Sequence, residues 1–391
     1  MKIGIFLGVE PNAGGMFQYA ESLLEALREM QSNGHEVCVA YLSHNWEKKL
    51  LSYPFKNVQM KCGRWSLNLS NVLMALKIPG SFSRFLSHIL SPVVWQLAKL
   101  DCDLWIFPAQ DALSYQVKVP VVATVHDLMH RYESSFPEVS SLRRGNIRDH
   151  RFSQLTQWAR TVLVDSEVGK MHVHESYGTE LEKIQVLPYI APGHIVNSQD
   201  LWNFDQKYPL PKKFIFYPAQ FWAHKNHQRL ISAAAALRSD YPDIHLVFTG
   251  MKNKAYSEVY AHAEKMGMLD HVTFQEYVPD QDLVGFYRRA RAMMMPTFFG
   301  PTNIPPLEAF ACGCPTAVSG IYGMPEQVGD AALLFDPNSE SDIASTMKRL
   351  WSDDQLCHEL SQRGLEKAQR WGLPAFAKKL QEILLKSPHS L

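Results

Sequence analysis

Short runs of aliphatic and β-branched residues alternate with longer stretches of helical periodicity along most of the chain, and this alternation constrains the fold more than any other feature. It is typical of parallel sheets covered by helices on both faces. We expect strands at residues 2–7, 36–42, 103–107, 121–125, 161–164 and 184–187. A second series is expected at residues 214–217, 244–248, 272–274, 292–295, 316–318 and 332–335. The fold class is therefore α/β, with two doubly wound Rossmann-like domains.

The alternation stops once, between Pro192 and Pro211, where Pro, Gly, Asn, Asp and Gln predominate. Such a composition is typical of a connector. We therefore predict domains over residues 1–195 and 206–370, followed by a final segment over 371–391. Open α/β domains bind ligands at the carboxyl ends of their strands, so the site is expected in a central cleft that both domains face.

Composition and charge exclude several classes of protein. A chain of 391 residues is too long for a single core. The 39 Lys and Arg residues balance 39 Asp and Glu residues, so bulk charge implies neither nucleic acid nor an acidic membrane. The six cysteines form no CxxC pair, which indicates reduced thiols and gives no sign of a metal site.

Two apolar stretches bear on localisation. Residues 3–7 form a short run that ends at Gly8, which is typical of a strand rather than of a signal peptide. Residues 82–100 contain Ser, His, Arg, Gln and Lys at intervals and are poorly suited to cross a bilayer. We expect a cytoplasmic protein, soluble or peripheral at the inner face of the membrane, with no nucleic-acid partner.

Polar residues follow several of the predicted strands. Gly14 and Gly15 open the first helix, where paired glycines permit a close backbone approach to a ligand or simply form a turn. The chain lacks a GxGxxG motif, which disfavours a nicotinamide or flavin cofactor. His126 ends another strand, beside Asp127, and is either a proton-transfer or hydroxyl-binding group or a structural histidine.

Two further loops lie between a strand and a helix. Lys225 precedes a helix start, where it is suited to neutralise a phosphate, although a surface lysine is the plain alternative. Residues 296–313 form a Gly, Pro and Asn loop followed by a helix that we expect to start at Pro305 or Pro306. Glu308 in its first turn either accepts a hydrogen bond from a sugar-nucleotide hydroxyl or only favours the helix dipole.

Taken together, these segments resemble the retaining glycosyltransferases of glycosyltransferase family 4. The matching stretches, in order, are residues 14–19, 125–127, 164–166, 186–188, 225–226, 273–279, 305–315 and 323–337. The resemblance implies a GT-B fold, a nucleotide-sugar donor bound by the C-terminal domain and an acceptor bound by the N-terminal domain. It also implies that the final helix returns to the N-terminal domain.

Residue roles follow from the resemblance. It places Lys225 at the diphosphate, Glu308 at the nucleotide ribose and His126 at the transferred sugar, and these three form the expected catalytic set. The expected donor-binding residues are Gly14, Gly15, Gln220, Tyr277, Val278, Gly300, Thr302, Asn303 and Ile304.

The chain departs from the family pattern at two positions. Gln220 stands where the family usually has Arg, which removes one positive charge near the diphosphate. Gly300 stands where the Glu-x7-Glu motif has its first glutamate, leaving Glu308 alone. Thr302, Asn303 and backbone amides then become the alternative ligands. Without a carboxylate at Gly300, attack on the same face as the departing diphosphate is favoured over a covalent intermediate.

The expected reaction moves a mannose- or glucose-type sugar from GDP-mannose or UDP-glucose to a glycan or lipid-linked hydroxyl in cell-surface polysaccharide synthesis. No metal or other cofactor is expected. A GT-B-like epimerase and a non-catalytic nucleotide-sugar-binding subunit are the alternatives. Four arginines form the expected acceptor or membrane patch: Arg143, Arg144, Arg148 and Arg151. A solvated basic helix face is its plain alternative.

Overall fold

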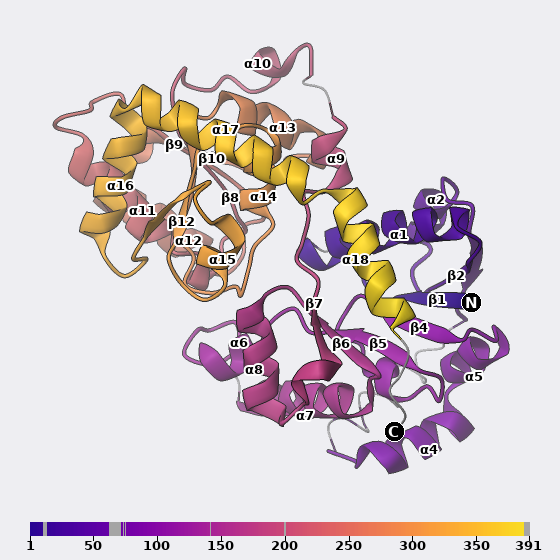
Figure 1. Ribbon diagram of the computed structural model, residues 1–391. Coiled ribbons are helices and arrows are strands. Elements are labelled where there is room, and N and C mark those ends of the chain that lie inside the picture. The colour runs from indigo at the N-terminus through magenta and orange to yellow at the C-terminus, as the bar shows by residue number, and fades with distance from the viewer. Residues whose placement is uncertain are drawn as a thin grey trace. The chain divides into compact units, whose positions relative to one another are not determined.

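The computed structural model describes residues 1–10, 14–61, 72, 74, 76–140, 142–198 and 201–386. The chain forms two compact units (Figure 1). Unit 1 comprises Met1–Ser135, Val139–Pro188 and Leu373–Leu391, and unit 2 comprises Phe136–Glu138 and Tyr189–Gly372. Each unit is a parallel sheet with helices, so the predicted fold class is confirmed.

Unit 1 is built on a seven-stranded parallel sheet in the order β3-β2-β1-β4-β5-β6-β7. Its strands are β1 (Lys2–Leu7), β2 (Glu36–Tyr41), β3 (Lys56–Gln59), β4 (Leu104–Phe107), β5 (Val121–Thr124), β6 (Thr161–Val164) and β7 (Ile184–Val186). The direction of winding reverses between β1 and β4, which makes this pair the topological switch point of the sheet. The sequence did not predict β3, whose Lys-Asn-Val-Gln segment contains one apolar residue.

Helices cover this sheet, and one of them comes from the far end of the chain. They are α1 (Gly15–Ser32), α2 (Asn45–Leu50), α4 (Gly80–Leu90), α5 (Pro92–Lys99), α6 (Met129–Tyr132), α7 (Leu142–Trp158), α8 (Glu167–Tyr177) and α18 (Leu373–Leu385), with 3-10 turns at Ala112–Tyr115 and Leu181–Lys183. Figure 1 shows α18 alongside α1. The rings of Phe376 in α18 and Tyr19 in α1 meet edge to face, 6.2 Å apart. The last helix therefore completes the core of unit 1.

Unit 2 is built on a six-stranded parallel sheet in the order β10-β9-β8-β11-β12-β13. Its strands are β8 (Ile215–Pro218), β9 (Leu246–Thr249), β10 (Val272–Gln275), β11 (Ala292–Met295), β12 (Thr316–Ser319) and β13 (Leu333–Phe335). Its helices are α9 (Gly193–Val196), α10 (Phe204–Lys207), α11 (His227–Leu237), α12 (Tyr256–Lys265), α13 (Asp280–Arg289), α14 (Pro305–Ala311), α15 (Met324–Val328), α16 (Glu340–Ser352) and α17 (Asp354–Arg370), with 3-10 turns at Ala223–Lys225 and Leu269–His271. Winding reverses between β8 and β11, the switch point of this sheet.

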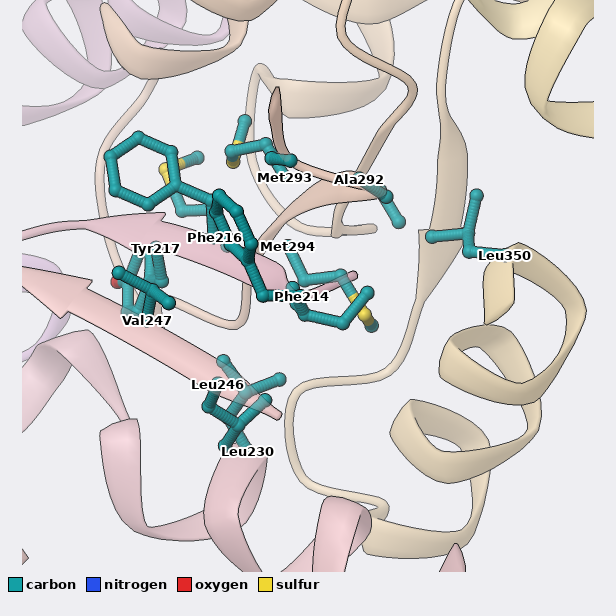
Figure 2. Close-up of a cluster of buried hydrophobic side chains, with 14 of the residues drawn as sticks. Phe214, Phe216, Tyr217, Leu230, Leu246, Val247, Ala292, Met293, Met294 and Leu350 are labelled. Atoms are coloured by element: carbon teal, nitrogen blue, oxygen red, sulfur yellow. The ribbon is translucent and has the colours of Figure 1, made fainter. Parts of the chain in front are cut away.

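The core of unit 2 surrounds β8 (Figure 2). Successive residues of this strand point to opposite faces of the sheet. Phe216 stacks on Phe286 of α13 at 5.4 Å, whereas Tyr217 packs against His227 of α11 at 4.8 Å. Burial on both faces explains why this strand is a continuous apolar run rather than an alternating one.

The segment that the sequence marks as a connector packs against unit 2. It contains α9 and α10, and Phe204 of α10 is 1% exposed. Its ring meets Phe286 edge to face at 5.1 Å and occupies the space that a Cβ at Gly285 would fill. The chain leaves unit 1 after Pro188, before the composition changes.

Among the described residues, no helix is long and apolar enough to cross a membrane.

Candidate functional site

Two loops face each other at the switch point of the unit 2 sheet. One follows β8 and carries Lys225, and the other follows β11 and carries Asn303. Lys225 Nζ donates a hydrogen bond of 3.2 Å to Asn303 Oδ1. The carboxyl ends of strands at a switch point form a crevice, which is where doubly wound sheets bind ligands. The structure therefore brings two of the predicted site residues into direct contact at the expected edge of the sheet.

The backbone of the Lys225 loop is fixed from both sides. The Tyr217 hydroxyl donates to the carbonyl oxygen of Lys225 at 3.0 Å. Asn226 has a left-handed backbone with φ of 60°, a conformation that asparagine tolerates better than most residues. Its buried amide donates to the carbonyl oxygens of Pro296 and Pro337, at 2.9 and 3.0 Å. These bonds join the loops after β8, β11 and β13 and set the place from which the Lys225 side chain starts.

The loop that contains Asn303 is also fixed. The Asn303 backbone N–H donates to Gln327 Oε1 at 3.1 Å, and the Asn303 carbonyl oxygen accepts from Gln327 Nε2 at 2.7 Å. Gly300 has φ of 136°, and a Cβ there would collide with the Asn303 amide. Glycine is therefore required at position 300 for this loop conformation, independently of any chemistry. Thr302 and Ile304 flank Asn303 in the same loop and are largely buried.

Glu308 lies in the first turns of α14, which begins at Pro305 as predicted. The side chain is 4% exposed, and its Oε2 accepts a hydrogen bond of 2.6 Å from the Tyr287 hydroxyl. Burial, with the Glu308 carboxylate next to it, raises the pKa of Tyr287 well above its ordinary value. Tyr287 therefore stays protonated and holds one carboxylate oxygen in place.

Gln220 joins the loop that follows β8 to the loop that follows β9. Its Oε1 accepts hydrogen bonds from Trp222 Nε1 at 3.0 Å and from Asn253 Nδ2 at 2.9 Å. Gly250 lies against the Ala219 backbone with φ of 150°. Tyr277 and Val278 follow β10, two strands away from β8, and Tyr277 is 59% exposed whereas Val278 is buried.

Residues from the first half of the chain contribute to unit 2. Glu138 Oε1 accepts hydrogen bonds from His224 Nδ1 at 3.1 Å and from its backbone N–H at 3.3 Å. Burial disfavours the ionised form of Glu138, but the hydrogen bonds from His224 outweigh it and lower the pKa to about 2. Phe136 stacks on Phe298 at 5.7 Å. Sequence reasoning missed Glu138, Asn253, Tyr287 and Gln327, because none of them lies in the loops that it singled out.

In unit 1, His126 follows β5 and is 8% exposed. Its Nε2 donates to the carbonyl oxygen of Pro108 at 2.8 Å, and the ring of Tyr19 meets it edge to face at 5.2 Å. Burial lowers the pKa of His126, which favours the neutral imidazole. Gly14 caps α1 with φ of 70°, and Gly15 begins the helix. Both glycines therefore lie in unit 1, as does His126.

The four predicted arginines lie in α7. The side chains of Arg143 and Arg144 are outside the described residues. Arg148 and Arg151 are both partly exposed, and Arg151 Nε is buried without a hydrogen-bond partner among the described residues.

Among all residues that the structure describes, no group of three or more His, Cys, Asp or Glu side chains is arranged to hold a metal ion.

Two parallel doubly wound units with polar loops at their switch points define the GT-B class, and solved structures support this fold. Anabaena HepE, in complex with UDP and glucose, matches with a TM-score of 0.74 over 98% of this chain and 99% of that chain, at 17% identity. Sucrose-phosphate synthase from Thermosynechococcus elongatus matches with a TM-score of 0.75 over 98% of both chains, at 17% identity. These identities are low, so the likeness concerns the fold.

Two family models cover most of the sequence. Residues 13–189 match Glycosyltransferase Family 4, and residues 198–367 match Glycosyl transferases group 1. Each unit therefore matches one glycosyltransferase family model, and the chain as a whole has the GT-B fold.

The curated relatives that it matches are bacterial. O-antigen chain mannosyltransferase B of Escherichia coli is 30% identical over 171 residues, which cover 42% of this chain and 44% of the relative. Serotype-specific mannosyltransferase WbdA of Escherichia coli is 25% identical over 279 residues, which cover 66% of this chain and 33% of the relative. The matched region thus spans less than half the length of these relatives.

Proposed function

We propose that this protein transfers a sugar from a nucleoside diphosphate sugar to a carbohydrate hydroxyl, with retention at the anomeric carbon. The hydrogen-bonded Lys225 and Asn303 at the switch point of unit 2 carry the proposal, because they place a cation and an amide where a doubly wound sheet binds its ligand. Glu308, five residues after Asn303, is buried and hydrogen-bonded by Tyr287, and its carboxylate supplies a fixed hydrogen-bond acceptor for the ribose hydroxyls.

The proposed chemistry follows from the charge that develops on the leaving diphosphate. The Lys225 ammonium stabilises this charge, together with the backbone amides of the loop at residues 300–304. Gln220 adds no formal charge, so the burden falls on Lys225. The Gln220 side chain instead serves to hold Trp222 and Asn253 in place.

Retention is proposed to occur without a covalent intermediate. Gly300 carries no carboxylate, so the acceptor hydroxyl attacks on the face from which the diphosphate departs, and the leaving oxygen takes its proton. Neutral His126 is assigned to a hydroxyl of the transferred sugar. Trapping of a glycosyl adduct on the protein, mapped by mass spectrometry, would contradict this mechanism.

The proposed donor is GDP-mannose, with UDP-glucose second. Relatives named as mannosyltransferases favour the former, and HepE bound to UDP and glucose favours the latter. The expected product is a cell-surface polysaccharide, in line with the O-antigen and serotype-specific names of the relatives and with the neighbour WaaG, described as a glycosyltransferase involved in lipopolysaccharide biosynthesis.

Contact with an anionic membrane surface is part of the proposal, and α4 is its most suitable element. Phe82, Phe85 and Ile89 of this helix are 51%, 58% and 50% exposed. Residues 48–100 contain eight Lys or Arg residues and no Asp or Glu, although the whole chain has equal numbers of each sign. Exposed apolar side chains within a segment of positive charge suit an anionic bilayer.

Substitution of Lys225 tests the proposed function. Lys225→Ala is expected to weaken binding of GDP or UDP, measured by calorimetry, by ten- to a hundredfold, because a charge-assisted contact is worth about 1.5–3 kcal/mol. Lys348→Ala, which removes an exposed lysine of α16 paired with Asp240 at 3.6 Å, is the matched control and should bind normally. An unchanged dissociation constant for Lys225→Ala would contradict the assignment.

A further inference from the structure

The switch point of the unit 1 sheet holds a carboxylate that the reaction proposed above does not use. Gly8 follows β1 and Asp111 follows β4, so the two residues occupy the topological places that Lys225 and Asn303 occupy in unit 2. A Cβ at Gly8 would lie 2.7 Å from Asp111 Oδ1 and 2.8 Å from Oδ2. The absence of a side chain at Gly8 is therefore what leaves room for the carboxylate.

Asp111 does not serve the local structure in the usual way. It precedes the 3-10 turn Ala112–Tyr115, where an aspartate side chain commonly caps the first N–H groups. Its side chain makes no such bond, and only its backbone carbonyl accepts from Ser114. The carboxylate is directed at Gly8 instead, towards the crevice that the ends of β1 and β4 form.

Three buried polar atoms in this region lack hydrogen-bond partners among the described residues. They are Asp111 Oδ2, Gln110 Nε2 and Arg151 Nε. Arg151 acts electrostatically on Asp111, which places its guanidinium near the carboxylate, but no ion pair joins them. A buried polar atom without a partner destabilises the fold. Asp111 and Arg151 act on each other and Gln110 is the chain neighbour of Asp111, so we take their unpaired atoms as candidates for binding one ligand.

The chemistry of these atoms narrows the class of ligand. Asp111 offers a hydrogen-bond acceptor, whereas Gln110 and Arg151 offer donors. A phosphate would be repelled by Asp111, a metal ion would be repelled by Arg151, and an apolar group would leave all three atoms unpaired. A sugar hydroxyl both donates and accepts hydrogen bonds and carries no charge, so it satisfies the set.

The same loop is tied to His126. The carbonyl of Pro108, three residues before Asp111, accepts the His126 Nε2 hydrogen bond at 2.8 Å. A hydroxyl bound by Asp111 would therefore lie beside the loop that positions His126, the residue assigned to the transferred sugar. An acceptor must reach that sugar, so we assign the hydroxyl to the acceptor.

We propose that Asp111, with Arg151 and Gln110, binds hydroxyl groups of an uncharged saccharide acceptor at the unit 1 switch point. Calling this saccharide the acceptor rests on the proposed transfer reaction, but the binding site itself lies entirely in unit 1. It assigns Arg151 to a carbohydrate site rather than to a membrane patch.

The test is saccharide binding measured by saturation-transfer-difference NMR on the full chain. The probes are α-mannobiose and maltose as neutral sugars, with mannose 6-phosphate and glucose 6-phosphate as charged ones. Asp111→Asn is expected to weaken binding of a neutral probe at least tenfold, because one charge-assisted hydrogen bond is lost. Gly8→Ala, which displaces the carboxylate without removing it, is expected to have the same effect, and the two changes together should do little more than one.

Asp149→Asn is the matched control. Asp149 also lies in unit 1, where it accepts hydrogen bonds from Arg131 and Tyr177, and its substitution should leave saccharide binding unchanged. The proposal fails if no probe binds the wild type, if only the phosphorylated sugars bind, or if Asp111→Asn binds as well as the wild type. The donor assignment is tested separately, by binding of GDP or UDP to the wild type and to Lys225→Ala. Failure of that test would leave saccharide binding at Asp111 unaffected, so the two failures are distinguishable.

Discussion

At the scale of single residues, Lys225 and Asp111 lie at the switch points of the two sheets and carry opposite charges. The Lys225 ammonium donates a hydrogen bond to the neutral Asn303 amide. Burial raises the pKa of Asp111 to about 6, and nearby Arg151 only partly offsets this effect. The folded protein therefore binds a proton on Asp111 more tightly than the unfolded chain does, and at neutral pH it holds an ionised carboxylate at a cost in stability.

This cost predicts how stability depends on pH. Protonated Asp111 favours the folded state, and this contribution to the free energy of unfolding is fully present below about pH 4, the ordinary pKa of aspartate. It is lost as the pH rises through about 6, where the carboxyl ionises in the folded protein. The loss amounts to about 3 kcal/mol at most, from a shift of roughly two pKa units. Asp111→Asn should therefore be more stable than the wild type at pH 7.5, and the difference should vanish near pH 4.

Urea denaturation of both proteins across this pH range is the measurement, with hydrogen exchange of β1 and β4 amides reporting on unit 1. A wild type that matches or exceeds the variant at pH 7.5 would show that Asp111 is paired within the fold. Asp149→Asn, with its loss of bonds to Arg131 and Tyr177, should instead be less stable than the wild type at neutral pH.

At the scale of elements, the loop between β11 and α14 is shaped by Gly300. Its φ of 136° belongs to a region that favours glycine, and its missing side chain makes room for Asn303. Asn303 in turn is held by Gln327 of α15 and contacts Lys225. The departure from the Glu-x7-Glu pattern is thus built into the backbone of the loop.

We predict that the family carboxylate cannot be restored at this position. Gly300→Glu should weaken GDP or UDP binding by tenfold or more, because the new Cβ displaces Asn303 and the backbone is strained by about 1–3 kcal/mol. Gly300→Ala separates geometry from charge, since it adds the same Cβ without a carboxylate, and should lose most of the same affinity. Tighter binding in either variant, measured by calorimetry, would show that the loop adapts.

The sequence predicted elements better than it predicted their partners. Buried parallel strands are continuous apolar runs, so twelve of them were found within two residues of their observed bounds, whereas β3, with only Val58 apolar, was missed. Phe204 was overlooked because it lies in a segment rich in polar and turn-forming residues, yet it is buried against Phe286. Lys225, Asn303 and Glu308 were singled out from loop and helix-start signals.

Their partners carried no such signal. Tyr287 lies 21 positions from Glu308, and His224 lies 86 positions from Glu138. Contacts between residues so far apart arise from topology, which neither periodicity nor spacing encodes. Asp111 was missed for a related reason, because its relation to Gly8 depends on β1 and β4 being neighbours in the sheet.

At the scale of the whole molecule, the chain passes between the two units four times. The last passage delivers α18 to unit 1, where Phe376, Leu380 and Leu384 are buried. Phe376 contacts Tyr19, whose ring in turn packs on His126. The stability of unit 1 therefore depends on a helix that follows all of unit 2 in the sequence.

Truncation of Phe376 tests this dependence. Phe376→Ala is expected to destabilise unit 1 by about 3–5 kcal/mol, as is typical of a fully buried phenylalanine. Nucleotide binding, assigned to unit 2, should be retained at low temperature. Hydrogen exchange of β1 and β4 should report the loss, and equal loss of protection in β8 and β11 would show that the two units unfold as one.

The position of α18 also has a consequence for synthesis on the ribosome. Residues 1–188 emerge first, but the helix that covers α1 emerges only after residues 189–372 have been made. At about 5–20 residues per second this interval lasts roughly 10–40 s. Throughout it the apolar side chains of α1 that later meet α18 have no native cover, so the nascent chain presents a surface for chaperones until translation has passed Leu385.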